Sequence, residues 1–75
     1  MSGWVSQRQV RNRAHGMVRV DDRHFWESDE EIGIFISALI GSGYTVDRSD
    51  AISVTLRSPA TDDGSYSFVH CWREG

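Results

Sequence analysis

The sequence predicts a two-layer α+β domain in which one amphipathic helix packs on a mostly antiparallel sheet of three to five strands. Two observations indicate this fold class: one stretch with helical periodicity, residues 28–40, and several short stretches in which apolar and polar residues alternate. A chain of 75 residues has room for a single small domain, residues 1–75. The expected order of elements is β-β-α-β-β.

The helix is expected to begin after Ser28, because this N-cap residue and Glu31 fit the capping box, in which each side chain accepts a free backbone N–H of the other residue. Gly41-Ser42-Gly43 should end it, since glycine readily adopts a left-handed conformation. Between these ends the apolar residues recur at spacings that place them on one stripe: Ile32, Phe35, Ile36, Leu39 and Ile40.

The opposite flank of this helix carries no charge. It consists of Gly33, Ile34, Ser37, Ala38 and Gly41, although a helix face in water normally carries charged residues. We therefore expect this flank to contact another protein or a second copy of the chain. Packing within the monomer and simple exposure are the alternatives.

Strand patterns lie on both sides of the helix. Residues 4–10 and 17–20 look strand-like and are joined by residues 12–16, while residues 44–46 suit a short strand and residues 47–50 a turn. Residues 51–58 alternate, with Ile52, Val54 and Leu56 on one side. Residues 65–73 alternate again after a turn-forming loop, so the last two strands should form a hairpin.

The last strand places Tyr66, Phe68, His70 and Trp72 on one side. The favoured interpretation is that this aromatic row faces the helix and completes the core with the apolar side of the preceding strand. If the row instead faces outward, it forms a platform on which single-stranded nucleic acid bases can stack.

Charge is unevenly distributed along the chain. Residues 1–24 contain five arginines and two aspartates, a net charge of +3, whereas residues 25–75 have a net charge of −6. A nucleic-acid-binding module would use Arg8, Arg11 and Arg13 for phosphates and Trp4 for stacking. The acidic total argues against this function, so it is the second hypothesis.

No motif predicts catalysis, a cofactor or a metal site. His15, His24 and His70 lack metal-ligand spacing, and adjacent His70 and Cys71 would point to opposite faces of a strand. A small enzyme with a site between subunits, using His24, His70 and Cys71, is the third hypothesis. The single cysteine excludes an internal disulfide and favours the cytoplasm.

The leading hypothesis is a non-enzymatic module that binds another protein and regulates or inhibits it. Its expected contacts are the flank residues Gly33, Ile34, Ser37 and Ala38, together with Asp62 and Asp63, whose charge would suit a partner that normally binds nucleic acid. The sequence contains arginine but no lysine, as is typical of GC-rich genomes. A bacterial or phage origin is therefore expected, with host machinery such as a defence nuclease complex as one target. No membrane contact is expected.

Overall fold

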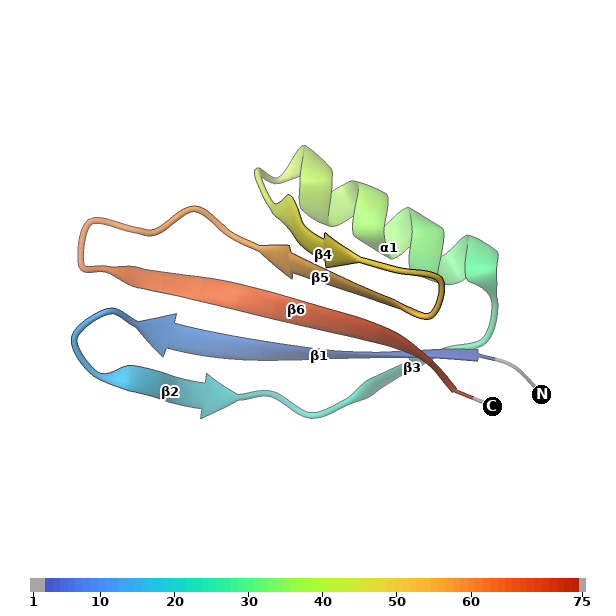
Figure 1. The fold of residues 1–75 in the computed structure, drawn as a ribbon, viewed down its shortest axis with the longest axis horizontal. Helices are drawn as coiled ribbons and strands as arrows, with labels where there is room; N and C mark the ends of the chain where they lie inside the picture. The colour runs from blue at the N-terminus through green and yellow to red at the C-terminus, as the bar shows by residue number, and fades with distance from the viewer. Residues whose placement is uncertain (1–2, 75) are drawn as a thin grey trace.

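The computed structural model describes residues 3–74, which form one helix and six strands. The elements are β1 (Gly3–Asn12), β2 (Gly16–Val20), β3 (His24–Trp26), α1 (Asp29–Gly41), β4 (Thr45–Ser49), β5 (Ser53–Arg57) and β6 (Ser65–Glu74). The strands form one antiparallel sheet in the order β2-β1-β6-β5-β4, and β3 also pairs with β1 (Figure 1). The α+β class is confirmed. The predicted element order β-β-α-β-β is incomplete, because β3 precedes the helix and because residues 45–49, which include part of the optional short strand at 44–46, form β4.

The helix begins and ends where local sequence signals place it. Ser28 Oγ accepts a hydrogen bond from the N–H of Glu31 at 3.2 Å. The Glu31 carboxylate accepts the N–H of Glu27 at 3.0 Å, one residue before the partner that the capping box predicts. Gly43 ends the helix with φ of +102° and donates its N–H to the carbonyl of Ile40 at 3.0 Å. A left-handed residue at this position is the usual helix stop.

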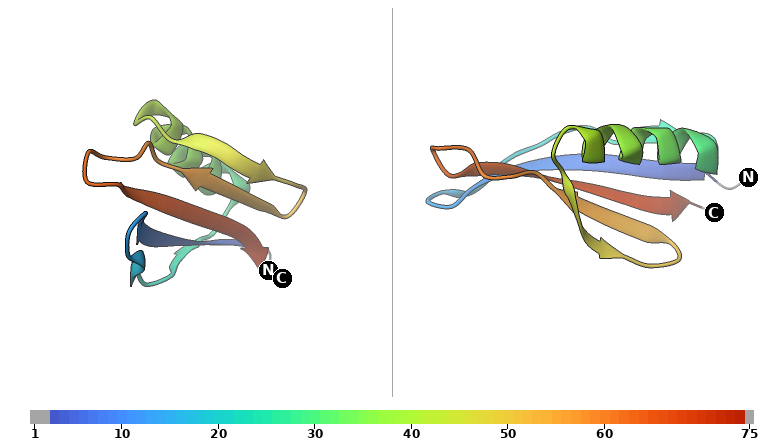
Figure 2. Two further views of the ribbon diagram at one scale, coloured as in Figure 1. Left: turned by 60° about the vertical axis from the view of Figure 1, so that its left-hand side comes forward. Right: turned by 90° about the horizontal axis from the view of Figure 1, so that it is seen from above.

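The molecule is elongated, with extents of 40 × 22 × 18 Å. The helix covers the part of the sheet near the two chain ends, and the β1–β2 and β5–β6 loops extend beyond it at the other end (Figures 1 and 2). One face of the sheet therefore carries the helix, and within residues 3–74 no element covers the other face.

The core lies between α1 and the sheet. Its buried members are Ile32, Leu56, Val69 and Cys71. Across β5 and β6, Leu56 pairs with Val69, so these two side chains lie on the same face. Partly buried apolar side chains complete the cluster: Trp4, Trp26, Phe35, Ile36, Leu39, Tyr44 and Val54.

The favoured orientation of the aromatic row is wrong. Val69 and Cys71 of β6 face the helix, and the alternation of a strand then directs Tyr66, Phe68, His70 and Trp72 to the other face. β6 lies in the middle of the sheet, so both of its faces carry apolar side chains. Alternation separates the two sets but does not say which one lies beneath the helix, since this depends on pairing with β1 and β5.

Three further details differ from the sequence expectations. Residues 24–26 form β3, which pairs with the first half of β1, a part of the strand that the shorter β2 does not reach. β4 continues to Ser49, and the turn begins at Asp50, whose carboxylate accepts the N–H groups of Ile52 and Ser53 at 2.9 Å each. Ile52 lies before β5 and is exposed instead of completing the core.

Candidate nucleic-acid interface

The sheet face opposite α1 is called the open face here. Cross-strand pairing places its central residues side by side, because residues directly opposite in an antiparallel pair share a face. They are Gln7, Gln9 and Arg11 of β1, Tyr66, Phe68, His70 and Trp72 of β6, Thr55 and Arg57 of β5, and Arg48 of β4. The open face therefore combines a central aromatic row with arginines from three other strands.

The aromatic row consists of rings in contact with one another. The Tyr66 and Phe68 ring centroids lie 5.5 Å apart in an edge-on arrangement, and the Phe68 and His70 rings are stacked with centroids 5.9 Å apart. All four rings are half-buried, so part of each remains accessible. Arginines lie over two of them: Arg11 over Phe68 and Arg23 over Trp72, at 5.5 and 5.4 Å from the ring centroids.

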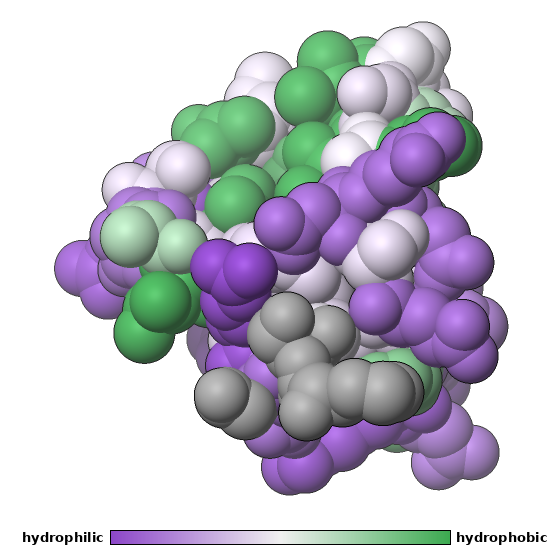
Figure 3. Space-filling view, turned by 90° about the vertical axis from the view of Figure 1, so that its right-hand side faces the viewer, coloured by the Kyte–Doolittle hydropathy of each residue, from purple (hydrophilic) through white to green (hydrophobic). Residues whose placement is uncertain are grey.

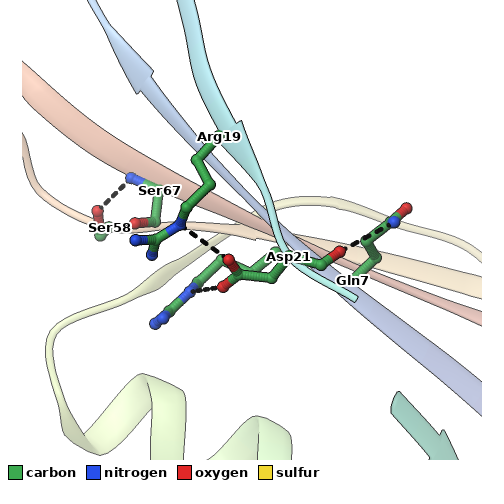
Figure 4. A network of polar contacts seen from close by, with 6 residues as sticks. Gln7, Arg19, Asp21, Ser58 and Ser67 are labelled. Atoms are coloured by element: carbon green, nitrogen blue, oxygen red, sulfur yellow. Dashed lines mark hydrogen bonds and ion pairs between the residues drawn. The ribbon is translucent and has the colours of Figure 1, made fainter. Parts of the chain in front are cut away.

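The three arginines on the helix side of the sheet are paired with two carboxylates. Asp21 accepts from Nε of Arg8 at 3.1 Å and from Nε of Arg19 at 2.8 Å (Figure 4). Arg73 lies 3.5 Å from Asp29 in the first turn of α1. Hydrogen bonding to Asp21 also raises the pKa of Arg8 above its ordinary value. Two carboxylates thus face three arginines, so these ion pairs engage the three guanidinium groups and offset part of their charge.

The other five arginines make no ion pair with any residue of 3–74. They are Arg11, Arg13, Arg23, Arg48 and Arg57. Arg11, Arg48 and Arg57 project from the open face, Arg23 reaches Trp72 there, and Arg13 follows β1 at the rim. Ion pairing therefore separates the arginines by face, and the five arginines without an ion pair among residues 3–74 surround the aromatic row.

Two hollows open beside the row. The Tyr66 hollow has a volume of about 390 Å³. It is lined by Arg13, Gly43, Thr45, Arg57, Ser58, Pro59, Ala60 and Tyr66. Ser58 Oγ also accepts the N–H of Ser67 at 2.8 Å, which fixes this side of the hollow (Figure 4). A volume of this size is in the range of pockets that hold small ligands or parts of larger ones.

The second hollow, the His70 hollow, has a volume of about 420 Å³. It is lined by Arg11, Asp47, Arg48, Thr55, Phe68 and His70. Thr55 Oγ1 lies 3.2 Å from Nδ1 of His70 and so orients the ring. Burial lowers the pKa of His70, and the nearby charge of Arg11 lowers it further. The imidazole is therefore neutral at pH 7, and the arginines carry the positive charge of this hollow.

The residues expected to bind nucleic acid are divided between two faces. Trp4 lies on the helix side, where its Nε1 donates to Asp29 at 2.7 Å, and Arg8 is paired with Asp21. Arg11 and Arg13 lie at the open face and its rim. Sequence reasoning missed Arg48 and Arg57. Arg57 could have been found from the sequence, because the alternation of residues 51–58 places it on the side of the strand away from the core.

The residues expected to bind a protein partner are also separated. Gly33, Ile34, Ser37 and Ala38 all lie on the exposed side of α1. Viewed from the end with the chain termini, apolar atoms gather over the helix in the upper part of the molecule (Figure 3). Asp62 and Asp63 lie in the β5–β6 loop, beyond the helix (Figure 1).

Asp63 has a structural role in this loop. Its carboxylate accepts hydrogen bonds from the Thr61 hydroxyl and, at 3.0 Å, from the N–H of Ser65. These bonds lower the pKa of Asp63.

The residues considered for catalysis are divided between the two faces of the sheet, with His24 and Cys71, both opposite Ser6, on the helix side. His70 is on the open face, whereas Cys71 is in the core and 1% exposed. Burial raises the pKa of the Cys71 thiol to about 11, the reverse of what a nucleophilic cysteine needs. Among residues 3–74, no three His, Cys, Asp or Glu side chains gather closely enough to hold a metal ion.

Comparison with known proteins does not identify a function for this chain. No family model matches the chain, and neither a curated protein nor a solved structure shows significant similarity to it. Within residues 3–74, no helix has the length and apolar character required to cross a bilayer.

Proposed function

We propose that this protein binds single-stranded nucleic acid on the open face of its sheet. The observation that carries the proposal is the separation of arginines by face. Arg8, Arg19 and Arg73 are paired with carboxylates on the helix side, whereas the arginines around the aromatic row have no such partner among residues 3–74. Unpaired arginines gain free energy when they replace the counterions of phosphates.

The aromatic row favours a single strand over a duplex. In a single strand the bases can turn outward and stack on rings or guanidinium planes, while in a duplex they are already stacked on one another. The row from Tyr66 to Trp72 is about 20 Å long at ~3.4 Å per residue. It is therefore long enough to contact several nucleotides, with arginines beside it for the backbone.

The test is fluorescence anisotropy with a labelled single strand of 12 nucleotides in 50 and 200 mM NaCl. Arg57→Gln should weaken binding at low salt and reduce the slope of log Kd against log salt by about one. Arg19→Gln is the matched control, because it removes the same charge from the helix side. The proposal fails if the wild-type protein does not bind at 50 mM NaCl, or if both variants lose affinity equally.

A second candidate is the regulation or inhibition of another protein through the helix flank. The observation that favours it is Ile34, which is 65% exposed on a flank without charge. A partner with a complementary apolar surface would bury this side chain. Ile34→Arg should abolish binding to such a partner without lowering the melting temperature, whereas Phe68→Leu should leave it unchanged. If Ile34→Arg retains partner binding, the helix flank is not the contact.

A further inference from the structure

We propose that the His70 hollow selects a guanine base. The inference rests on the proposed binding of nucleic acid and names the base that this part of the open face recognises. The different charges of the two hollows, the hydrogen-bonding groups of the bases and an irregularity in β4 support it.

The two hollows differ by one carboxylate. The Tyr66 hollow has two arginines and several hydroxyls but no acidic residue, which suits a phosphate or a sugar. In the His70 hollow, Asp47 lies beside Arg11 and Arg48. A carboxylate repels a phosphate and accepts hydrogen bonds only, so this exposed side chain suits a ligand group that donates N–H. The bases of a single strand carry such groups on their exposed edges.

Guanine matches this combination of groups best. Its N1–H and N2 amino group lie on one edge and can both donate to the two oxygens of Asp47. Its O6 and N7 are two acceptors for an arginine fork, the commonest specific contact to this base. Adenine and cytosine each offer a single amino group, and uracil a single ring N–H. None of these bases can occupy both carboxylate oxygens and an arginine fork together.

An irregularity in β4 brings the two charged groups to the same place. Adjacent residues of a regular strand point to opposite faces, yet Asp47 and Arg48 both line the His70 hollow. The pairing of β4 with β5 shifts register between Val46 and Arg48, which is the effect of a β-bulge. Bulges redirect side chains in this way. Phe68 and His70 supply the ring surface beneath, and Thr55 holds the His70 ring.

The experiment compares labelled strands of ten nucleotides that are all uridine except for one central guanosine or, in the control strand, one adenosine. Wild-type protein should bind the guanosine strand at least about tenfold more tightly, given the strength of paired base contacts. Asp47→Asn should abolish this preference while retaining binding to the adenosine strand. Asp62→Asn, an acid outside the hollow, should keep the preference, and thermal melting checks the fold of both variants.

Competition with mononucleotides identifies the source of the base. If GMP but not AMP displaces the guanosine strand, the hollow also accepts a free nucleotide; if neither does, it accepts guanine within a strand. Displacement by both overturns the inference. Equal affinity for the two strands also overturns it and leaves the proposed function intact, whereas binding of neither strand at 50 mM NaCl overturns both.

Discussion

The guanidinium carbon of Arg11 lies 5.5 Å from the centre of the Phe68 ring, on the sheet face opposite the helix. An arginine above an aromatic ring gains about 0.5–1 kcal/mol at an exposed site. Within residues 3–74, the only side-chain hydrogen bond of Arg11 runs from Nη2 to Oε1 of Gln9, at 3.3 Å. The ring therefore holds the side chain in place without neutralising it, and the charge remains available to an anionic ligand.

Replacing Phe68 should weaken binding of a single strand without unfolding the protein. Stacking on a ring contributes about 1–3 kcal/mol per base, so Phe68→Leu should raise Kd by roughly 5- to 150-fold. Phe35→Leu is the matched control, because Phe35 stacks on Trp26 at the helix side of the sheet. Anisotropy titrations at constant salt measure both effects. An unchanged Kd for Phe68→Leu would remove the stacking platform from the proposal.

Cys71 should be almost unreactive in the folded protein. Burial raises the pKa of its thiol to about 11 from an ordinary value of 9.0, and the residue is 1% exposed. Because the thiolate is the reactive form, a rise of this size lowers reactivity about 100-fold near pH 7.5, before any steric protection. The rate of labelling with a chromogenic disulfide should therefore increase steeply in urea, in parallel with unfolding. Fast labelling without denaturant would contradict the buried position.

Leu56 should be among the most sensitive positions of the core, since its side chain is 0% exposed between α1 and the sheet. Leu56→Ala leaves a cavity and should lower the free energy of unfolding by about 2–5 kcal/mol. For a domain of this length, that is a large part of a total stability of roughly 4–11 kcal/mol. Ile52→Ala, at an exposed site four residues earlier, should change it by less than about 0.5 kcal/mol. Urea unfolding followed by tryptophan fluorescence gives both values, and similar losses would place Ile52 in the core.

The helix could be predicted because its signals are local. The hydrogen bond from Glu31 to Ser28 and the positive φ of Gly43 depend on residues within a few positions of each other. The alternation of side chains in residues 65–73 could also be recognised from the sequence. Which face of that strand lies beneath the helix could not be predicted, because it depends on pairing with β1, about 60 residues away in sequence. Arg8 and Arg11 lie three positions apart, so alternation alone places them on opposite faces of β1; pairing decides which of the two shares the face of the aromatic row.

The His70 hollow could not be predicted from the sequence for the same reason, because strands far apart along the chain form it. Its residues come from four strands, and no spacing in the sequence relates Asp47 to Arg11 or His70. The bulge in β4 was hidden because residues 47–50 resemble a turn in composition. Sequence reasoning therefore identified the aromatic row as a candidate platform together with Arg11 and Arg13, but not Asp47, Arg48 or Arg57 beside it.

Because of His70, the free energy of unfolding should decrease as the pH falls below about 6.5. Burial and the charge of Arg11 lower its pKa below the ordinary value of 6.5, so below pH 6.5 the unfolded chain takes up more protons than the folded protein. The stabilising contribution is complete above pH 6.5 and is lost as the pH falls through the lower pKa of the folded state. The groups around the ring are Arg11 and Gln7 of β1, Thr55 of β5, Asp47 and Arg48 of β4, and the neighbouring Phe68 and Trp72 of β6.

Carboxylates affect stability in a separate and lower range of pH. Hydrogen bonds lower the pKa values of Asp50 and Asp63 from 3.8, so their contributions are present above about pH 3.8 and are lost below it. Urea unfolding at pH 8, 7, 6 and 5 should therefore show a decline that His70→Gln removes. His15→Gln, in the exposed β1–β2 turn, should retain the decline. If the decline persists in His70→Gln, another group is its cause, and the low pKa of the imidazole is not linked to folding.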